Sequence, residues 1–187
     1  VALAQALQFE ITLRQKDVIG EWVPQSERGT SDVIDGNSKW LWGLRWSEID
    51  KNLILRHTTS KRQKDIEVDL RLAPMVMEEL TAMFPDLVLP SSGPVIVYED
   101  SGQPYMAHQF RRVWRTVANA AGVPKNVYNM DSRAGAITEA TDAGAELEDV
   151  RHAATHGDIS MTQRYSRGGT EKTAKVMRLR AEHLNKK

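Results

Sequence analysis

A tyrosine near the C-terminus is the first residue whose surroundings suggest chemistry. Tyr165 follows His156 by 165 − 156 = 9 positions and lies in a polar segment. Its neighbours are Gln163, Arg164, Ser166 and Arg167. A tyrosine in a protein core is normally flanked by periodic apolar residues, which are missing here. We therefore expect the Tyr165 phenol to face a charged, hydrated partner.

The segment NMDSRAGAITEATDAGAELEDVRHAATHGDISMTQRYSR, residues 129–167, resembles the C-terminal half of the tyrosine recombinase (phage integrase) catalytic domain. In that family an H-x-x-R motif opens a helix, a histidine follows, and a nucleophilic tyrosine comes nine residues later. Arg133 matches the motif arginine, and His156 lies 156 − 133 = 23 positions beyond it. The resemblance covers nearly all of the chain. It implies a catalytic domain over residues 1–187, without the N-terminal DNA-binding domain that members usually carry.

Two upstream strings resemble the region of the family's first catalytic arginine, usually written G-L-R-x-x-E-L. TLRQKDVIGEW makes Arg14 the candidate, with Asp17 in place of the usual glutamate. GLRWSEID, which contains Arg45, looks like a string that follows that arginine in many phage integrases. Counting back from this string puts Asn37 near the catalytic position, and an amide cannot supply the charge. We therefore prefer Arg14, interpret residues 23–40 as an insertion, and expect Arg45 to be structural.

The family's catalytic lysine lies on a hairpin turn, typically in T-K-T-G-K, and TTSKRQKDIEVDL matches this pattern. Lys61 is the favoured candidate and Lys64 the second. The alternative for Lys61 is an ordinary solvated turn lysine. The resemblance also implies that Lys64, Arg62 and Arg164 contact DNA.

Attack on a phosphodiester places negative charge on the non-bridging oxygens. Guanidinium groups such as those of Arg14 and Arg133 can meet these oxygens bidentately and stay charged at every working pH. A free tyrosine has a pKa of about 10, so Tyr165 needs nearby positive charge or a general base. The leaving 5′ oxygen needs a proton, which a hairpin lysine can deliver. This chemistry requires neither a metal ion nor a cofactor.

Met130 stands where the family's motif has histidine, or lysine in some members. A thioether cannot take the phenol proton at neutral pH. Three interpretations stay open: His156, water or a substrate oxygen substitutes; the enzyme is slow; or the chain is a degraded copy. The leading function is a site-specific DNA recombinase. The alternatives are a non-catalytic DNA-binding remnant and a type IB topoisomerase-like strand transferase.

The bulk composition excludes some classes of protein. The chain contains no cysteine, which fits a reducing cytoplasm, and no apolar run approaches bilayer length. A formal net charge of +0 argues against a generic polyanion-binding coat. The family resemblance implies double-stranded DNA as the partner, a tetramer in the synapse, and self-association through a C-terminal helix over residues 171–184. It also implies a bacterial or phage origin.

Apolar periodicity predicts the elements that must position these residues. The predicted fold class is α+β, mostly helical, with a small three-stranded antiparallel sheet. Leu3, Leu7 and Ile11 mark an N-terminal helix. Residues 23–38, which include Gly29 and Gly36, are expected to form a loop. Strands are expected over 39–46, 52–59 and 64–70, with Trp40, Trp42 and Trp46 on one face of the first. Further helices are expected over 73–83, 104–124, 130–144 and 145–155, and from about Met161 after a Ser160–Gln163 capping box. The helix over 104–124 is expected to bury the stripe of Met106, Phe110, Val113, Trp114 and Val117.

Overall fold

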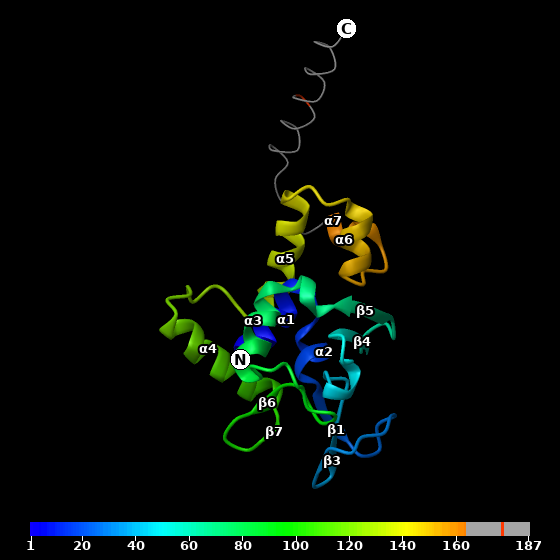
Figure 1. The fold of residues 1–187 in the computed structure, drawn as a ribbon, viewed down its shortest axis with the longest axis vertical. Coiled ribbons are helices and arrows are strands. Elements are labelled where there is room, and N and C mark those ends of the chain that lie inside the picture. Colours follow the sequence, from blue (N-terminus) through cyan, green and yellow to red (C-terminus); the bar gives the residue numbers. More distant parts are fainter. Residues whose placement is uncertain (164–176, 178–187) are drawn as a thin grey trace. The chain divides into compact units, whose positions relative to one another are not determined.

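The computed structural model of the protein describes residues 1–163 and residue 177. The chain divides into two compact units, Val1–Ala136 (the first unit) and Ile137–Lys187 (the second unit). The predicted fold class is confirmed, since helices predominate and the strands form small antiparallel sheets (Figure 1). Among the described residues, no helix combines the length and the apolar character that a membrane crossing requires.

The core of the first unit is built around its N-terminal helix. The helices of this unit are α1 (Ala2–Glu10), α2 (Gln15–Ile19), α3 (Pro74–Met83), α4 (Ala107–Ala120) and the short 3₁₀ helices η1 (Trp46–Glu48) and η2 (Leu70–Leu72). The predicted apolar face of α1 is confirmed, because Leu3, Leu7 and Ile11 are all buried. This face packs in one hydrophobic cluster with α3, which buries Val76 and Leu80.

The region predicted as a loop contains strands, which corrects the expectation for residues 23–38. Strands β1 (Glu21–Pro24), β2 (Ile34–Asp35) and β3 (Ser38–Leu41) form a three-stranded antiparallel sheet in the order β1-β3-β2. The glycines that suggested a loop, Gly29 and Gly36, lie in the turns between these strands. A three-stranded antiparallel sheet is therefore found, but of the three predicted strands it contains only the one that overlaps β3.

The predicted strand over 39–46 is wrong beyond its first half. Strand β3 ends at Leu41, Trp42 follows with a left-handed φ of 66°, and Trp46 opens η1. The tryptophans therefore do not share one strand face. The Trp40 indole lies against Gly20 and Gly43, where any Cβ would collide with the ring. Gly43 thus lets the backbone that follows the strand pass close to this ring.

A separate hairpin confirms the two later predicted strands. Strands β4 (Ile54–Thr58) and β5 (Asp65–Asp69) pair antiparallel, with Ile54 opposite Asp69 and Thr58 opposite Asp65. Alternating burial along β4 places Leu55 and His57 inside. A third small sheet consists of β6 (Val97–Tyr98) and β7 (Gln103–Pro104).

Helix α4 confirms the clearest helix prediction with a narrower buried stripe. Phe110 and Trp114 are buried, as expected. Met106 and Val117, predicted to be buried with them, are 44% and 47% exposed. The backbone turns at Gly122, whose φ of 74° suits glycine directly after the helix end.

Helices α5 (Asp131–Asp142), α6 (Leu147–Ala153) and α7 (Ile159–Gln163) follow as expected. The boundary between the two units falls within α5. In the second unit Ile137, Val150 and Ala154 form a small core. The predicted Ser160–Gln163 capping box is wrong, because the helix begins at Ile159. Asp158 caps it instead, accepting the Ser160 backbone N–H at 2.9 Å.

Candidate active site

Arg14 and a buried carboxylate form the first part of the candidate site. Arg14 is the residue before α2, with an extended backbone, and its side chain is 20% exposed. Asp17, one turn further, is fully buried, and its Oδ2 lies 3.7 Å from Arg14 Nη1. The other carboxylate oxygen accepts the backbone N–H of Ser60 at 2.7 Å. Asp17 therefore links the predicted catalytic arginine to the hairpin turn 43 residues away.

The turn of the β4–β5 hairpin presents the predicted lysine. Thr59 is buried and closes the turn, because its N–H donates to the Lys64 carbonyl at 2.9 Å. Lys61, Arg62 and Lys64 are all exposed. Since Ser60 is held by Asp17, Lys61 starts from a fixed backbone position beside the Arg14 segment. The structure thus brings together the segments of Arg14 and Lys61.

Arg133, near the C-terminal end of the first unit in the sequence, contacts the segment that precedes Arg14. It lies in the first turn of α5 and its side chain is half-buried. Its Nη1 donates to the backbone carbonyl of Thr12, two residues before Arg14. Thr12 has a left-handed φ of 55°, which ends the run of α1. The two arginines that were predicted from distant motifs are therefore joined through one backbone segment.

Met130 is 73% exposed. It precedes α5, between the buried Asn129 and Asp131, the first residue of the helix, whose Oδ2 accepts the Tyr128 N–H at 2.7 Å. The backbone around Met130 is thus fixed while its side chain is open to solvent. A thioether offers neither charge nor a useful proton acceptor there.

His156 belongs to the second unit and is held by residues close to it in the sequence. It is buried, and its Nδ1 shares a hydrogen bond of 3.0 Å with Thr162 Oγ1. Its carbonyl accepts from Arg151 Nη1 at 3.0 Å. A histidine fixed in this way presents a defined ring orientation. Tyr165 and Arg164 lie outside the described residues.

Arginine–carboxylate pairs explain the perturbed carboxyl groups near these segments. Arg45 donates to Asp32 at 2.6 Å and lies over the Trp40 ring, which fits the expected structural role. This hydrogen bond lowers the pKa of the Asp32 carboxyl. The hydrogen bond from Arg151 likewise lowers the pKa of Glu148.

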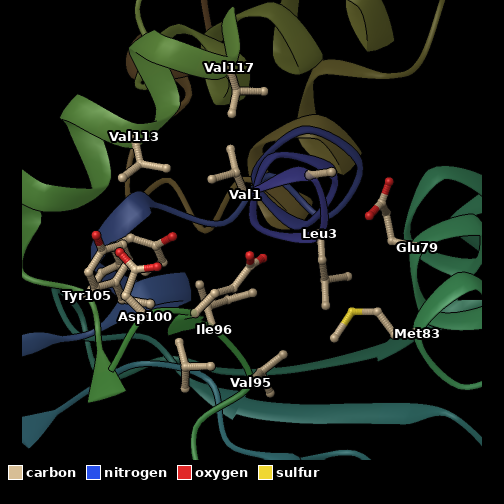
Figure 2. A pocket seen from close by; sticks show the side chains of 14 residues that line it. Val1, Leu3, Glu79, Met83, Val95, Ile96, Asp100, Tyr105, Val113 and Val117 are labelled. Atoms are coloured by element: carbon tan, nitrogen blue, oxygen red, sulfur yellow. The ribbon is translucent and has the colours of Figure 1, made fainter. Parts of the chain in front are cut away.

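The first unit also contains a cavity of about 670 Å³, lined by α1, α3, α4 and the β6–β7 hairpin (Figure 2). Its walls are largely apolar, with carboxylates of Glu79 and Asp100 among the lining groups. Burial raises the pKa of Tyr105, and a hydrogen bond to Asp100 raises that of Tyr98. Of the predicted site residues that the structure describes, none lines this cavity.

Some residues that hold the site carried no sequence signal for that role. Thr12 and Ser60 act through their backbone, and any residue type could supply those groups. Thr162 could have been proposed as a hydrogen-bond partner of His156, because it lies six residues after His156 and three before Tyr165. Asp17 was recognisable only as a counterpart of the family's glutamate.

Hydrogen bonds through Asp17 and the Thr12 carbonyl thus link two arginine-bearing segments to a hairpin turn that carries exposed cations, and such cations suit an anionic group such as a phosphodiester. The chain belongs to the phage integrase family, whose sequence model matches residues 40–171. A search of curated proteins finds no match.

Solved recombinase structures share the fold. The Tn1549 transposon integrase in complex with circular intermediate DNA is 13% identical with a TM-score of 0.59, covering 94% of this chain and 56% of that one. XerA recombinase is 15% identical with a TM-score of 0.54, covering 73% and 49%. XerH recombinase bound to a palindromic difH substrate is 10% identical with a TM-score of 0.53, covering 94% and 44%. The chain thus spans about half the length of these proteins.

Proposed function

We propose that the chain is the catalytic part of a site-specific recombinase that cleaves and rejoins double-stranded DNA through a 3′-phosphotyrosyl intermediate. The observation that carries the proposal is the joining of Arg14, Arg133 and the Lys61 turn through Asp17 and the Thr12 carbonyl. Two arginines on linked segments can supply guanidinium donors for the two non-bridging oxygens of a phosphate. Membership of the phage integrase family supports the same chemistry.

The proposed cleavage step balances without an external reagent. Tyr165 Oη forms a bond to phosphorus, and the bond between phosphorus and the 5′ oxygen breaks. The phenol proton leaves to a base or to water, and Lys61 gives a proton to the departing 5′ oxygen. A second 5′-hydroxyl then reverses these changes on another strand, so the energy of the phosphodiester bond is conserved and no cofactor is needed. Arg14 and Arg133 stabilise the charge on the non-bridging oxygens, and a lost donor of this kind costs about 10²–10³ in rate.

We assign the remaining DNA contacts to three further cations. Arg62 and Lys64 follow Lys61 in the hairpin turn, and Arg164 precedes the nucleophile in the sequence. We expect these side chains to bind backbone phosphates, so their loss would weaken binding to all sequences alike. We also propose a tetramer in the synapse, in which residues 171–184 of one copy dock on its neighbour.

The test is covalent capture. The chain is incubated with a pool of nicked duplexes of random sequence, and adducts that survive denaturation are recovered and sequenced. We expect an adduct that disappears in Tyr165→Phe, which removes only the nucleophilic oxygen. The control Tyr128→Phe removes the hydroxyl of a different tyrosine, which is exposed, and should retain the adduct. An adduct that persists in Tyr165→Phe would refute the assignment.

Met130 favours a second candidate, a DNA-binding remnant that no longer cleaves. The motif position that should supply a base or a cation carries an exposed thioether. Binding to the duplex pool with no adduct, also when the chain is joined to any further domains of its natural protein, would establish the remnant. Relaxation of supercoiled DNA without strand exchange would instead indicate a topoisomerase-like activity.

A further inference from the structure

The first turn of α5, which carries Arg133, is fastened to α1 by one side-chain amide. We infer that Gln5 is a positioning residue for Arg133, an inference that rests on the proposed function. Gln5 lies on α1, more than 120 residues away from its partners before and within α5. It does not touch the reacting atoms and acts through the backbone it holds.

The Gln5 amide makes three hydrogen bonds to three different segments. Its Oε1 accepts from Trp114 Nε1 of α4 at 2.8 Å and from Asn129 Nδ2 at 2.9 Å. Its Nε2 donates to Ser132 Oγ in the first turn of α5. The Ser132 hydroxyl in turn donates to the Asn129 carbonyl at 2.7 Å. One amide therefore ties together α1, α4 and the start of α5.

The network needs one group that accepts two hydrogen bonds and donates a third, so few side chains other than an amide can replace Gln5. Both lone pairs of Gln5 Oε1 are used, and the indole of Trp114 can only donate. Asn129 is buried, and its Oδ1 accepts no hydrogen bond among the described residues. The bond to Gln5 is thus the one described hydrogen bond of the Asn129 side chain. Without Gln5, Asn129 and Trp114 would both have buried polar groups without partners.

Gln5 acts on Arg133 through the backbone of the first turn of α5. Ser132 and Arg133 are adjacent, and Arg133 donates to Thr12 just beyond the end of α1. The same helix and its exit therefore hold the start of α5 at two points. When Gln5 is lost, the attachment of Ser132 to α1 is lost, while the Arg133 bond to Thr12 remains. A displacement of about 1 Å in a catalytic group can cost about 10²-fold in rate.

The test compares Gln5→Met with Gln8→Met. Methionine keeps the length of the side chain and removes the amide. Gln8 lies on the same helix and is buried, but its amide donates to Ala4 within that helix. We expect Gln5→Met to slow cleavage of a recovered duplex by about 10-fold to 10²-fold, and Gln8→Met to have little effect. Equal effects of the two variants would overturn the inference.

A second substrate separates positioning of Arg133 from a general loss of structure. A methylphosphonate at the scissile position lacks one negative charge, so the reaction depends less on the guanidinium. If Gln5 acts through Arg133, the defect of Gln5→Met should disappear with at least one methylphosphonate diastereomer. A defect of the same size on both substrates would overturn the proposal.

A third measurement does not depend on cleavage. The side-chain N–H signals of Arg133 and of the Trp114 indole are followed by nuclear magnetic resonance in the protein without DNA. We expect Gln5→Met to shift both signals and to accelerate their exchange with solvent, and Gln8→Met to leave them in place. If the wild type gives no DNA adduct but this pattern holds, the proposed function fails while the role of Gln5 in holding Arg133 stands. Unchanged Arg133 signals would overturn that role.

Discussion

In the part of the chain that the structure describes, long-range hydrogen bonds link the candidate site segments of the first unit, whereas short-range hydrogen bonds contact His156 in the second unit. Asp17 and Ser60 are 43 residues apart, and Arg133 and Thr12 are 121 apart. His156 bonds to Thr162 and Arg151, six and five residues away. The two kinds of support respond differently to mutation. A lost distant bond frees two segments that only the fold brings together, while a lost local bond loosens one turn.

The largest effect is expected from Asp17→Asn, which tests the link between Arg14 and the hairpin turn. The amide can still accept the Ser60 N–H, but it no longer balances the charge of Arg14. The destabilisation should stay below the about 3–5 kcal/mol seen for fully buried pairs, because water reaches the Arg14 side chain. Cleavage should fall by about 10²–10³-fold, as for the loss of one oriented donor. Denaturant unfolding and adduct formation measure the two effects.

Asp86→Asn is the matched control, since Asp86 is an exposed carboxylate of the same unit. It should change neither stability nor rate. If Asp17→Asn unfolds at the wild-type denaturant concentration and cleaves at the wild-type rate, the carboxylate does not link Arg14 to the hairpin.

The second largest effect is expected from Met130→His, which changes an exposed site position. Because Met130 is 73% exposed, the change should leave stability within about 0.5 kcal/mol. A histidine there could accept the phenol proton, so we expect cleavage to rise by about 10²-fold, the lower end for general-base help. Met75→His, on the exposed side of α3, is the control. An unchanged rate would mean that another group already takes the proton.

The contrast between the units also explains what the sequence could predict. Helix α1 follows from its own apolar spacing, and Arg14, Arg133 and Lys61 follow from motifs that resemble a family. The alternating tryptophans of residues 40–46 predicted a strand that is too long. Their alternation does not reveal that the backbone turns after Leu41. The ties from Gln5 to Trp114, Asn129 and Ser132 depend on packing between segments more than 100 residues apart. A local sequence pattern cannot predict a hydrogen bond between such distant residues.

The smallest effect is expected from Glu148→Gln, which weakens the short-range bonds around His156. Glu148 accepts two hydrogen bonds of 2.9 Å from Arg151 Nε, and Arg151 in turn donates to the His156 carbonyl. Glu148→Gln should therefore reduce the exchange protection of the His156 amide by only about twofold, because the pair is exposed. Arg151 holds the Glu148 pKa below its ordinary value of 4.5, so the stabilisation is present above that pH. It is lost as the pH falls through the lowered pKa.

The difference between Glu148→Gln and the wild type should accordingly vanish in acid and also shrink in high salt. Glu146→Gln, a neighbouring exposed glutamate at the same helix end, should show neither dependence. The amide of His156, which donates to the Arg151 carbonyl at 2.9 Å, is the reporter for both variants. A pH-independent loss of protection in Glu148→Gln would show that helix propensity, and not the ion pair, supports this turn. The local support of His156 would then reside in Thr162 and the Arg151 backbone.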